Sequence, residues 1–405
     1  MSPSTLDSPQ SWARLALALA LATIGGVGMW SVVVALPAVQ ADFGVARGAA
    51  SLPYTLTMLG FGVAGVVVGR LVDRFGILRP MLVSSALLGL GYLLSGYATT
   101  LTGFALAQGL LIGVGSSVTF GPLLAHVSMW FERRRGIAVA LVASGNYLAG
   151  TIWPPVVQHF ISVAGWRATY AGVGVFILAT MLPLALLLRR PPPPHHDAPE
   201  GARRTAAGTP RALGLSPSAL QGLLVVAGVA CCVAMAMPQV HIVAYCSDLG
   251  YGPARGAQML SLMLGFGIVS RVTFGMISDR IGGLRTLLLG GGLQCVALLL
   301  FLPFDGLVSL YVISALFGLF QGGIVPSYAI IVREYFPARE AGGRIGVVIL
   351  ATLVGMALGG WMSGVIFDLT GSYHAAFLHG IAWNLVNVSI ASWLIFRTRA
   401  RPAIA

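Results

Sequence analysis

The sequence predicts an all-α membrane protein whose twelve transmembrane helices form two six-helix bundles around a central cavity. Three observations predict this fold class. Hydrophobic residues make up 57% of the chain and charged residues only 9%, which is far from the composition of soluble domains. Apolar runs of about 20 residues, long enough to cross a bilayer, recur along the whole chain. A charged motif of the first half also returns in the second, which indicates an internal repeat.

Each apolar run lies between charged or turn-rich breaks, and we expect each run to form one membrane-spanning helix. The approximate limits of the runs are 14–39, 50–71, 79–98, 102–130, 136–160, 167–188, 218–246, 255–279, 285–303, 307–335, 342–368 and 374–396. Residues 189–217 are rich in proline and charge and predict a flexible cytoplasmic linker. The two bundles are therefore expected in residues 1–188 and 218–405.

The orientation follows from the arginines, since the chain has 24 basic residues and none is lysine. Placing the N-terminus in the cytoplasm puts 20 of the 24 on that side and leaves Arg47, Arg167 and Arg255 outside and Arg271 within the membrane. The positive-inside rule therefore predicts cytoplasmic termini. Arginine-only usage is typical of a GC-rich bacterial genome, so we expect a multi-pass protein of the bacterial inner membrane. Because the arginines are spread over the loops, nucleic-acid binding is excluded.

The internal repeat is clearest in two charged loops. GRLVDRFGILRP, residues 69–80, matches GMISDRIGGLRT, residues 275–286, with glycine, aspartate, arginine, glycine and arginine recurring in place. A repeat of six spans in the same orientation predicts two bundles related by an axis along the membrane normal. In that arrangement a binding site lies between the bundles, near the bilayer midplane.

Arg271 is the leading candidate for a functional residue. It lies in an apolar run from about residue 257 to 277, at hydrocarbon depth. A guanidinium does not lose its proton and costs at least ~2.5 kcal/mol at such depth, so it needs a water-filled cavity and an anionic partner. The twelve acidic residues all fall in loops or near predicted span ends. A bound anion with one negative charge is therefore the expected partner.

The loop at residues 69–80 resembles the signature loop of the major facilitator superfamily, and the twelve-span layout extends the resemblance over essentially the whole chain. The resemblance implies transport by alternating access. It also implies a cytoplasmic charge lock that stabilises the outward-open state. Carried over to this chain, the residues of the lock are Asp73, Arg74, Arg79, Asp279 and Arg280.

Within the superfamily the chain is most similar to the monocarboxylate transporters and their bacterial relatives, including oxalate:formate antiporters. The similarity rests on Arg271 before the second signature loop, on MPQVHIVAYCSDLG with His241, and on SMWFERRRGIAVALVASG. It implies that Arg271 pairs with the substrate carboxylate and that His241 is a substrate-side ligand. Animal members carry an aspartate where this chain has Gly267. Oxalate transporters carry a second cation in the eleventh span, where this chain has only Arg344 near its edge.

These features predict a secondary transporter of a small monocarboxylate such as L-lactate or pyruvate, by proton-coupled symport. His241 is the expected proton-coupling group together with Arg271, because imidazole changes charge near neutral pH; a packing role for His241 is the alternative. The runner-up function is exchange of one carboxylate for another. An arginine that recognises an amphipathic drug anion is a third possibility.

Further polar and aromatic residues lie where the cavity is expected. Asn146 and Asn384 can donate and accept hydrogen bonds, although helix packing also explains them. Phe120 and Tyr328 lie beside proline kinks and Met29 lies in the first span, so each is a candidate to line or close the cavity. These five residues complete the predicted substrate site.

Other functional classes lack support in the sequence. An enzyme would be expected to show an acid–base pair at one depth or a motif such as GxSxG, HExxH or a P-loop, and none occurs. A sensor would need a soluble output domain. His195 and His196 in the linker are weak evidence for metal binding, so we expect no metal and no cofactor. The expected partners are the carboxylate, the proton and the lipid bilayer, with the protein acting as a monomer.

Overall fold

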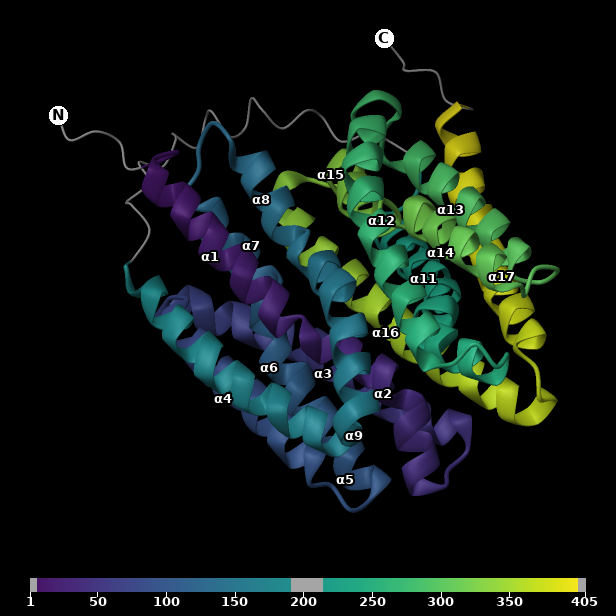
Figure 1. Cartoon of the computed structure of the whole chain (residues 1–405). Helices are drawn as coiled ribbons and strands as arrows, with labels where there is room; N and C mark the ends of the chain where they lie inside the picture. Colours follow the sequence, from purple (N-terminus) through teal and green to yellow (C-terminus); the bar gives the residue numbers. More distant parts are fainter. Residues whose placement is uncertain (1–5, 191–213, 400–405) are drawn as a thin grey trace, which may run out of the picture. The chain divides into compact units, whose positions relative to one another are not determined.

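The computed structural model describes residues 6–190 and 214–399, and in these residues every regular element is a helix (Figure 1). Eleven stretches of the described chain are long and apolar enough to cross a membrane. One of them, Arg135–Arg189, has 55 residues, far more than one crossing needs. It bends at Gly165, where φ is 80° and ψ is 162°. The stretch therefore holds two spans, and the prediction of twelve is confirmed.

The first half contains more helical segments than spans, because several spans are interrupted. The segments are α1 (Pro9–Gly25), α2 (Val27–Phe43), α3 (Arg47–Phe75), α4 (Leu78–Gly96), α5 (Leu101–Leu106), η1 (Ala107–Gly113), α6 (Val114–Ser116), η2 (Ser117–Thr119), α7 (Gly121–Ser128), α8 (Arg135–Ala143), α9 (Gly145–Leu186) and η3 (Leu187–Arg189). The segment η1 is a π-helix and η2 is a 3₁₀-helix. Such irregular turns in membrane helices often mark functional sites.

The interruptions of the first and fourth spans pack against each other. The first span is broken at Gly26, and the fourth leaves helical geometry at Phe120, with φ −115° and ψ −97°. A Cβ atom at Gly25 would lie 2.4 Å from the Cγ2 atom of Thr119, and one at Gly28 would lie 2.1 Å from the Oγ atom of Ser116. Glycine at these two positions therefore permits the close approach of the two broken spans.

The second half has longer continuous helices. They are α11 (Pro217–Asp248), α12 (Pro253–Ile281), α13 (Gly283–Leu300), α14 (Leu307–Gln321), α15 (Ile324–Tyr335), α16 (Ala338–Thr370) and α17 (Tyr373–Arg399). The tenth span, expected as one helix over 307–335, is broken between α14 and α15. Two glycines, Gly322 and Gly323, occupy the break, and glycine has the lowest helix propensity of any residue except proline.

The described chain divides into two compact units. Ile242–Leu264, which comprises the end of α11 and the start of α12, belongs to the first unit with helices α1–α9. The guanidinium of Arg47 forms an ion pair with Asp248 at 3.0 Å in this unit. The Ser261 hydroxyl also donates to the carbonyl oxygen of Thr151. The remainder of α11 and α12 forms the second unit with α13–α17.

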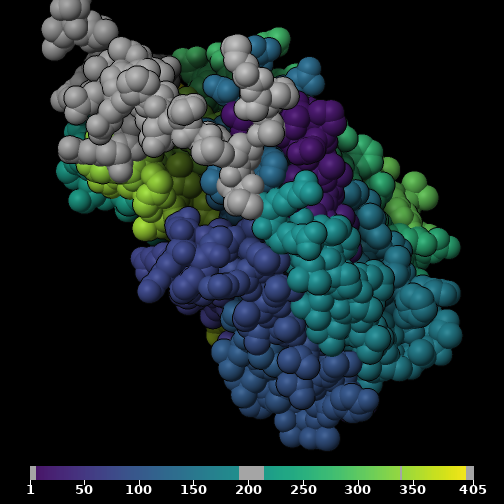
Figure 2. Space-filling model, turned by 90° about the vertical axis from the view of Figure 1, so that its left-hand side faces the viewer, coloured from purple at the N-terminus to yellow at the C-terminus, as the bar shows by residue number. Residues whose placement is uncertain are grey.

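Large apolar side chains cover much of the outer surface. Figure 2 shows one face of the molecule, on which helices of the first half, in blue to teal, are prominent. Val63 and Val83 are each 60% exposed, and Leu94 is 56% exposed. Exposed aliphatic side chains in this number suit a hydrocarbon environment and would be costly in water.

Candidate functional site

Arg271 lies inside α12, ten residues before the helix ends at Ile281. That spacing corresponds to about 15 Å along the helix axis. The side chain is half-buried. Because Asp279 and Arg280 occupy the end of the helix, Arg271 lies about two turns inside the apolar part of α12, where a charged side chain is costly.

The break in the tenth span packs against the part of α12 that carries Arg271. A Cβ atom at Gly323 would lie 2.1 Å from the Cβ atom of Phe274, and one at Gly322 would lie 2.8 Å from the Cβ atom of Ser270. The two glycines therefore let the α14–α15 break pack directly on α12. Because consecutive helical residues are about 100° apart, Arg271 projects beside this contact rather than into it.

His241 is fully buried in α11, and its ring contacts two neighbouring helices. The Nε2 atom lies 2.7 Å from the carbonyl oxygen of Gly360 in α16, and the Nδ1 atom lies 3.4 Å from the hydroxyl of Tyr373 in α17. A neutral imidazole that donates from Nε2 and accepts at Nδ1 satisfies both contacts. Substrate contact at either ring nitrogen would require one of these hydrogen bonds to be exchanged.

Tyr328 and Asn384 are fully buried and bonded between helices of the second half. The Tyr328 hydroxyl donates to the Oδ1 atom of Asn387 at 3.0 Å, which joins α15 to α17. The Nδ2 atom of Asn384 donates to the carbonyl oxygen of Gly291 at 2.7 Å, which joins α17 to α13. Both residues therefore have a packing role in this structure, and their contact with substrate stays a prediction.

Asn146 and Phe120 lie next to helix breaks in the first half. Asn146 follows the α8–α9 break, and its carbonyl oxygen accepts a hydrogen bond from the indole of Trp30 at 3.3 Å. Its Oδ1 atom is buried without a hydrogen-bond partner in the described residues. Phe120 is half-buried at the break before α7, whereas Met29 is buried in α2 at 9% exposure. Of these three, Asn146 has an unused polar atom.

A pair of glutamines was not singled out from the sequence. The Nε2 atom of Gln239 donates to the Oε1 atom of Gln321 at 2.7 Å, and both side chains are buried. Gln321 is the last residue of α14, directly before the glycine break that packs on α12. Its own Nε2 atom has no hydrogen-bond partner in the described residues. The feature of the sequence that could have pointed to this pair is Gln239, which lies two residues before His241 in an apolar run.

The five residues of the expected charge lock lie at the ends of α3 and α12 and the start of α4. Within the described part of the chain, none of them forms an ion pair. Arg74 instead lies 5.2 Å from the centroid of the Phe75 ring. Their role as a charge lock stays a prediction. No group of three metal-ligating side chains occurs in the described residues either.

Membrane-spanning helices, interrupted spans and an arginine inside an apolar span are typical of a membrane transport protein. The family model of the Major Facilitator Superfamily matches residues 18–309 and 268–404. The chain belongs to this superfamily. It is a multi-pass membrane transporter and not an enzyme.

Several relatives are similar over most of the chain. Monocarboxylate transporter 13 of Rattus norvegicus is 31% identical over 77% of this chain and 72% of its own length. Human monocarboxylate transporter 12 is 26% identical over 80% of this chain and 67% of its own. The Bacillus subtilis MFS-type transporter YcxA, described as uncharacterized, is 24% identical over 81% of both chains.

Among solved structures, a bacterial homologue of the human lysosomal transporter Spinster matches with a TM-score of 0.72. It covers 98% of this chain and 99% of its own at 15% sequence identity, in a conformation described as inward-facing and occupied. At this identity the match shows the fold alone. The predicted fold class is confirmed.

Proposed function

We propose that this transporter carries a small monocarboxylate such as L-lactate or pyruvate, and that Arg271 binds its carboxylate. The observation that carries the proposal is the position of Arg271 about 15 Å from the nearer end of α12, at membrane depth. The relatives named monocarboxylate transporters support the substrate class. An arginine fork matches a carboxylate with two parallel hydrogen bonds.

The distribution of acids supports a substrate with a single negative charge. Every acidic residue in the described chain lies in a loop or within two residues of a helix end, whereas Arg271 lies ten residues from the end of α12. We propose that the substrate carboxylate supplies the negative charge that the guanidinium of Arg271 binds. A dicarboxylate would bring a second charge into low dielectric, where an unpaired charge is costly.

We assign recognition of the second substrate oxygen to the glutamine pair or to His241. The Nε2 atom of Gln321 is an available donor, and its residue adjoins the break that packs beside Arg271. His241 has both ring nitrogens in contact with Gly360 and Tyr373, so it would bind substrate only after losing one of them. Asn146 and Phe120 of the first half stay candidates for substrate contact.

The proposed coupling ion is a proton. Since no acid of the described chain lies deep in a span, the groups that can carry the proton are His241 and the substrate carboxylate itself. Neutralisation of Arg271 by substrate lowers the cost of closing the cavity, which permits alternating access.

The test is uptake of labelled L-lactate by proteoliposomes with and without an inward proton gradient. Wild type is compared with Arg271→Gln, Arg271→Lys and the control Arg255→Gln. Arg255 starts the same helix and contacts Gln258 at 3.2 Å on the surface. We expect gradient-driven uptake in wild type and Arg255→Gln, loss of at least about tenfold in Arg271→Gln, and partial activity in Arg271→Lys.

Equal uptake by wild type and Arg271→Gln would refute the role of the arginine. Uptake only into vesicles preloaded with a carboxylate would refute symport and favour exchange. The variant His241→Gln separates a coupling role from a binding role. If His241 binds substrate, the variant should have a higher half-saturating lactate concentration than wild type. If His241 couples transport to the proton, uptake by the variant should no longer depend on the proton gradient.

A further inference from the structure

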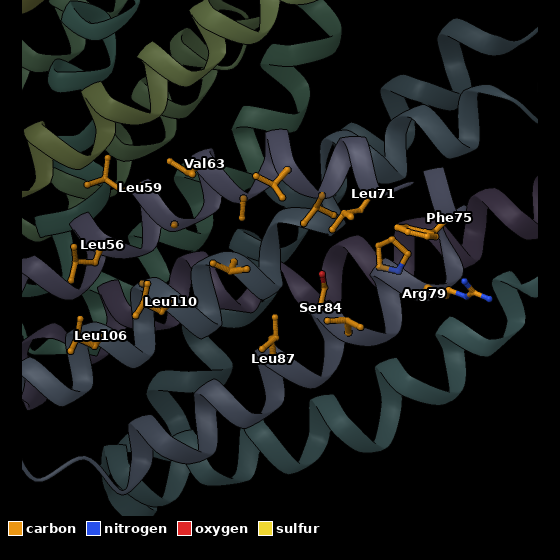
Figure 3. Close-up of a pocket in the computed structure, with 18 residues that line it drawn as sticks. Leu56, Leu59, Val63, Leu71, Phe75, Arg79, Ser84, Leu87, Leu106 and Leu110 are labelled. Atoms are coloured by element: carbon orange, nitrogen blue, oxygen red, sulfur yellow. The ribbon is translucent and has the colours of Figure 1, made fainter. Parts of the chain in front are cut away.

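An elongated apolar groove runs along the surface of the first half between α3 and α4. Its volume is about 840 Å³, and α5, η1 and α6 also line it. Figure 3 shows leucines such as Leu56, Leu106 and Leu110 toward one end, and Phe75 and Arg79 at the other. Residues 56 to 75 of α3 extend over about 28 Å, so the groove follows nearly the whole depth of the membrane.

The irregular fourth span shapes this groove. A Cβ atom at Gly60 of α3 would lie 2.1 Å from the carbonyl oxygen of Gly109 in η1. The two glycines therefore let η1 pack directly against α3, and the π-helix forms part of the groove wall. The residues that line the groove and point outward are apolar: Val63 is 60% exposed, Val83 60% and Leu110 63%. A surface of this kind at membrane depth is in contact with lipid.

Only one end of the groove carries charge. Arg79 is the single charged residue among the 18 that line it. Its side chain is exposed and has no ion pair or hydrogen bond in the described part of the chain. Arg70 and Arg74 lie on the last turns of α3, and Asp73 is the acid between them, so the local balance is three positive charges against one negative. An anion is favoured at this end.

We propose that the groove binds an anionic phospholipid, with an acyl chain along α3 and α4 and the phosphate at Arg79. The apolar walls and the basic end complement the two parts of such a molecule. The half of the groove nearest Arg79 covers about 15 Å, the depth of one leaflet's hydrocarbon. An anionic headgroup is preferred over a zwitterionic one because no acid lines the groove and the three arginines at this end outnumber Asp73.

The experiment compares lipid binding by the purified full-length chain using native mass spectrometry. Phosphatidylglycerol and phosphatidylcholine with identical acyl chains are added to wild type and to Arg79→Gln, Arg285→Gln and Val83→Trp. Arg285 occupies the equivalent place in the repeat, at the start of α13, and is also exposed. Val83→Trp fills the groove while it leaves the charge in place.

We expect wild type and Arg285→Gln to retain phosphatidylglycerol about fivefold better than phosphatidylcholine, which is the ~1 kcal/mol that one arginine contributes at an anionic lipid surface. Arg79→Gln should lose the preference, and Val83→Trp should retain less of either lipid. Equal retention of both lipids by wild type, or the same preference in Arg79→Gln, would overturn the proposal. So would inorganic phosphate that displaces phosphatidylglycerol completely, because the acyl chain would then contribute nothing. Folding of each variant is checked by its gel-filtration profile.

Discussion

The ion pair between Arg47 and Asp248 predicts an unequal response to removal of its two partners. Arg47 starts α3 and Asp248 ends α11. The guanidinium bonds both carboxylate oxygens, at 3.0 and 3.2 Å, and its Nε atom donates to the Oε1 atom of Gln40 at 2.5 Å. The Arg47 side chain is 8% exposed, whereas that of Asp248 is 35% exposed. Water can therefore hydrate the aspartate alone but not the arginine alone.

The magnitudes follow from these exposures. Removal of one partner of a fully buried pair costs about 3–5 kcal/mol. Because Asp248 is partly hydrated, we expect about 2–3 kcal/mol for Asp248→Asn, which leaves the Arg47 charge buried. Arg47→Gln leaves a carboxylate that water reaches, and we expect about 1 kcal/mol. The more exposed pair of Arg167 and Asp42, at 2.6 Å with both side chains about 40% exposed, serves as the control and should couple by at most ~1 kcal/mol.

The assay is a double-mutant cycle on the free energy of unfolding, measured by equilibrium denaturation in mixed detergent micelles. The cycle uses Arg47→Gln, Asp248→Asn and the double variant, with the matching cycle on the control pair. We expect the double variant to be no less stable than Asp248→Asn, since it no longer contains an isolated buried charge. The reasoning is refuted if the two single variants cost the same, or if the control pair couples as strongly.

Three other predictions follow from single contacts. The backbone N–H groups of Arg133 and its two neighbours lower the pKa of the Asp7 carboxyl below its ordinary value of 3.8. The ionised carboxylate therefore stabilises the fold above pH 3.8, and this stabilisation is lost as the pH falls through the lowered pKa. Asp7→Asn should lower the melting temperature at pH 7, and the difference from wild type should shrink as the solution is made more acidic. Gly323→Ala should cost about 1–3 kcal/mol and reduce the maximal uptake rate, because its Cβ would meet Phe274 at 2.1 Å; unchanged uptake would show that the break can yield. Tyr328→Phe should cost about 1–2 kcal/mol of stability at an unchanged half-saturating substrate concentration, and a raised value would instead place its hydroxyl on the substrate.

The positions of the spans were predictable because hydrophobic run length is a direct physical requirement of the bilayer. The run predicted at 255–279, for example, is α12 at Pro253–Ile281. The interruptions were not predictable in the same way. Glycine and proline are tolerated inside membrane helices wherever neighbouring helices compensate the backbone, so Gly322 and Gly323 gave no sign that 307–335 is two helices. The packing of α12 on the break depends on residues more than forty positions away.

The candidate site shows the same division. A lone arginine in an apolar run identifies Arg271 without any tertiary information, because its cost in lipid is a property of the residue itself. The contacts of His241 depend on the register of α16 and α17, which place Gly360 and Tyr373 at its ring. Hydrophobic periodicity does not determine that register in chains that are apolar on every face.

The turn at Gly165 has a practical consequence for probes of this protein. The fifth and sixth spans join there through one glycine with φ of 80°, and the connections at residues 44–46, 97–100, 249–252 and 371–372 are also only two to four residues long. An epitope inserted at any of them would separate two helices. An antibody fragment raised against one of these turns would have to bind the helix ends beside it. Because those ends belong to the helices that move during transport, we expect such a fragment to restrict their movement and so to inhibit transport.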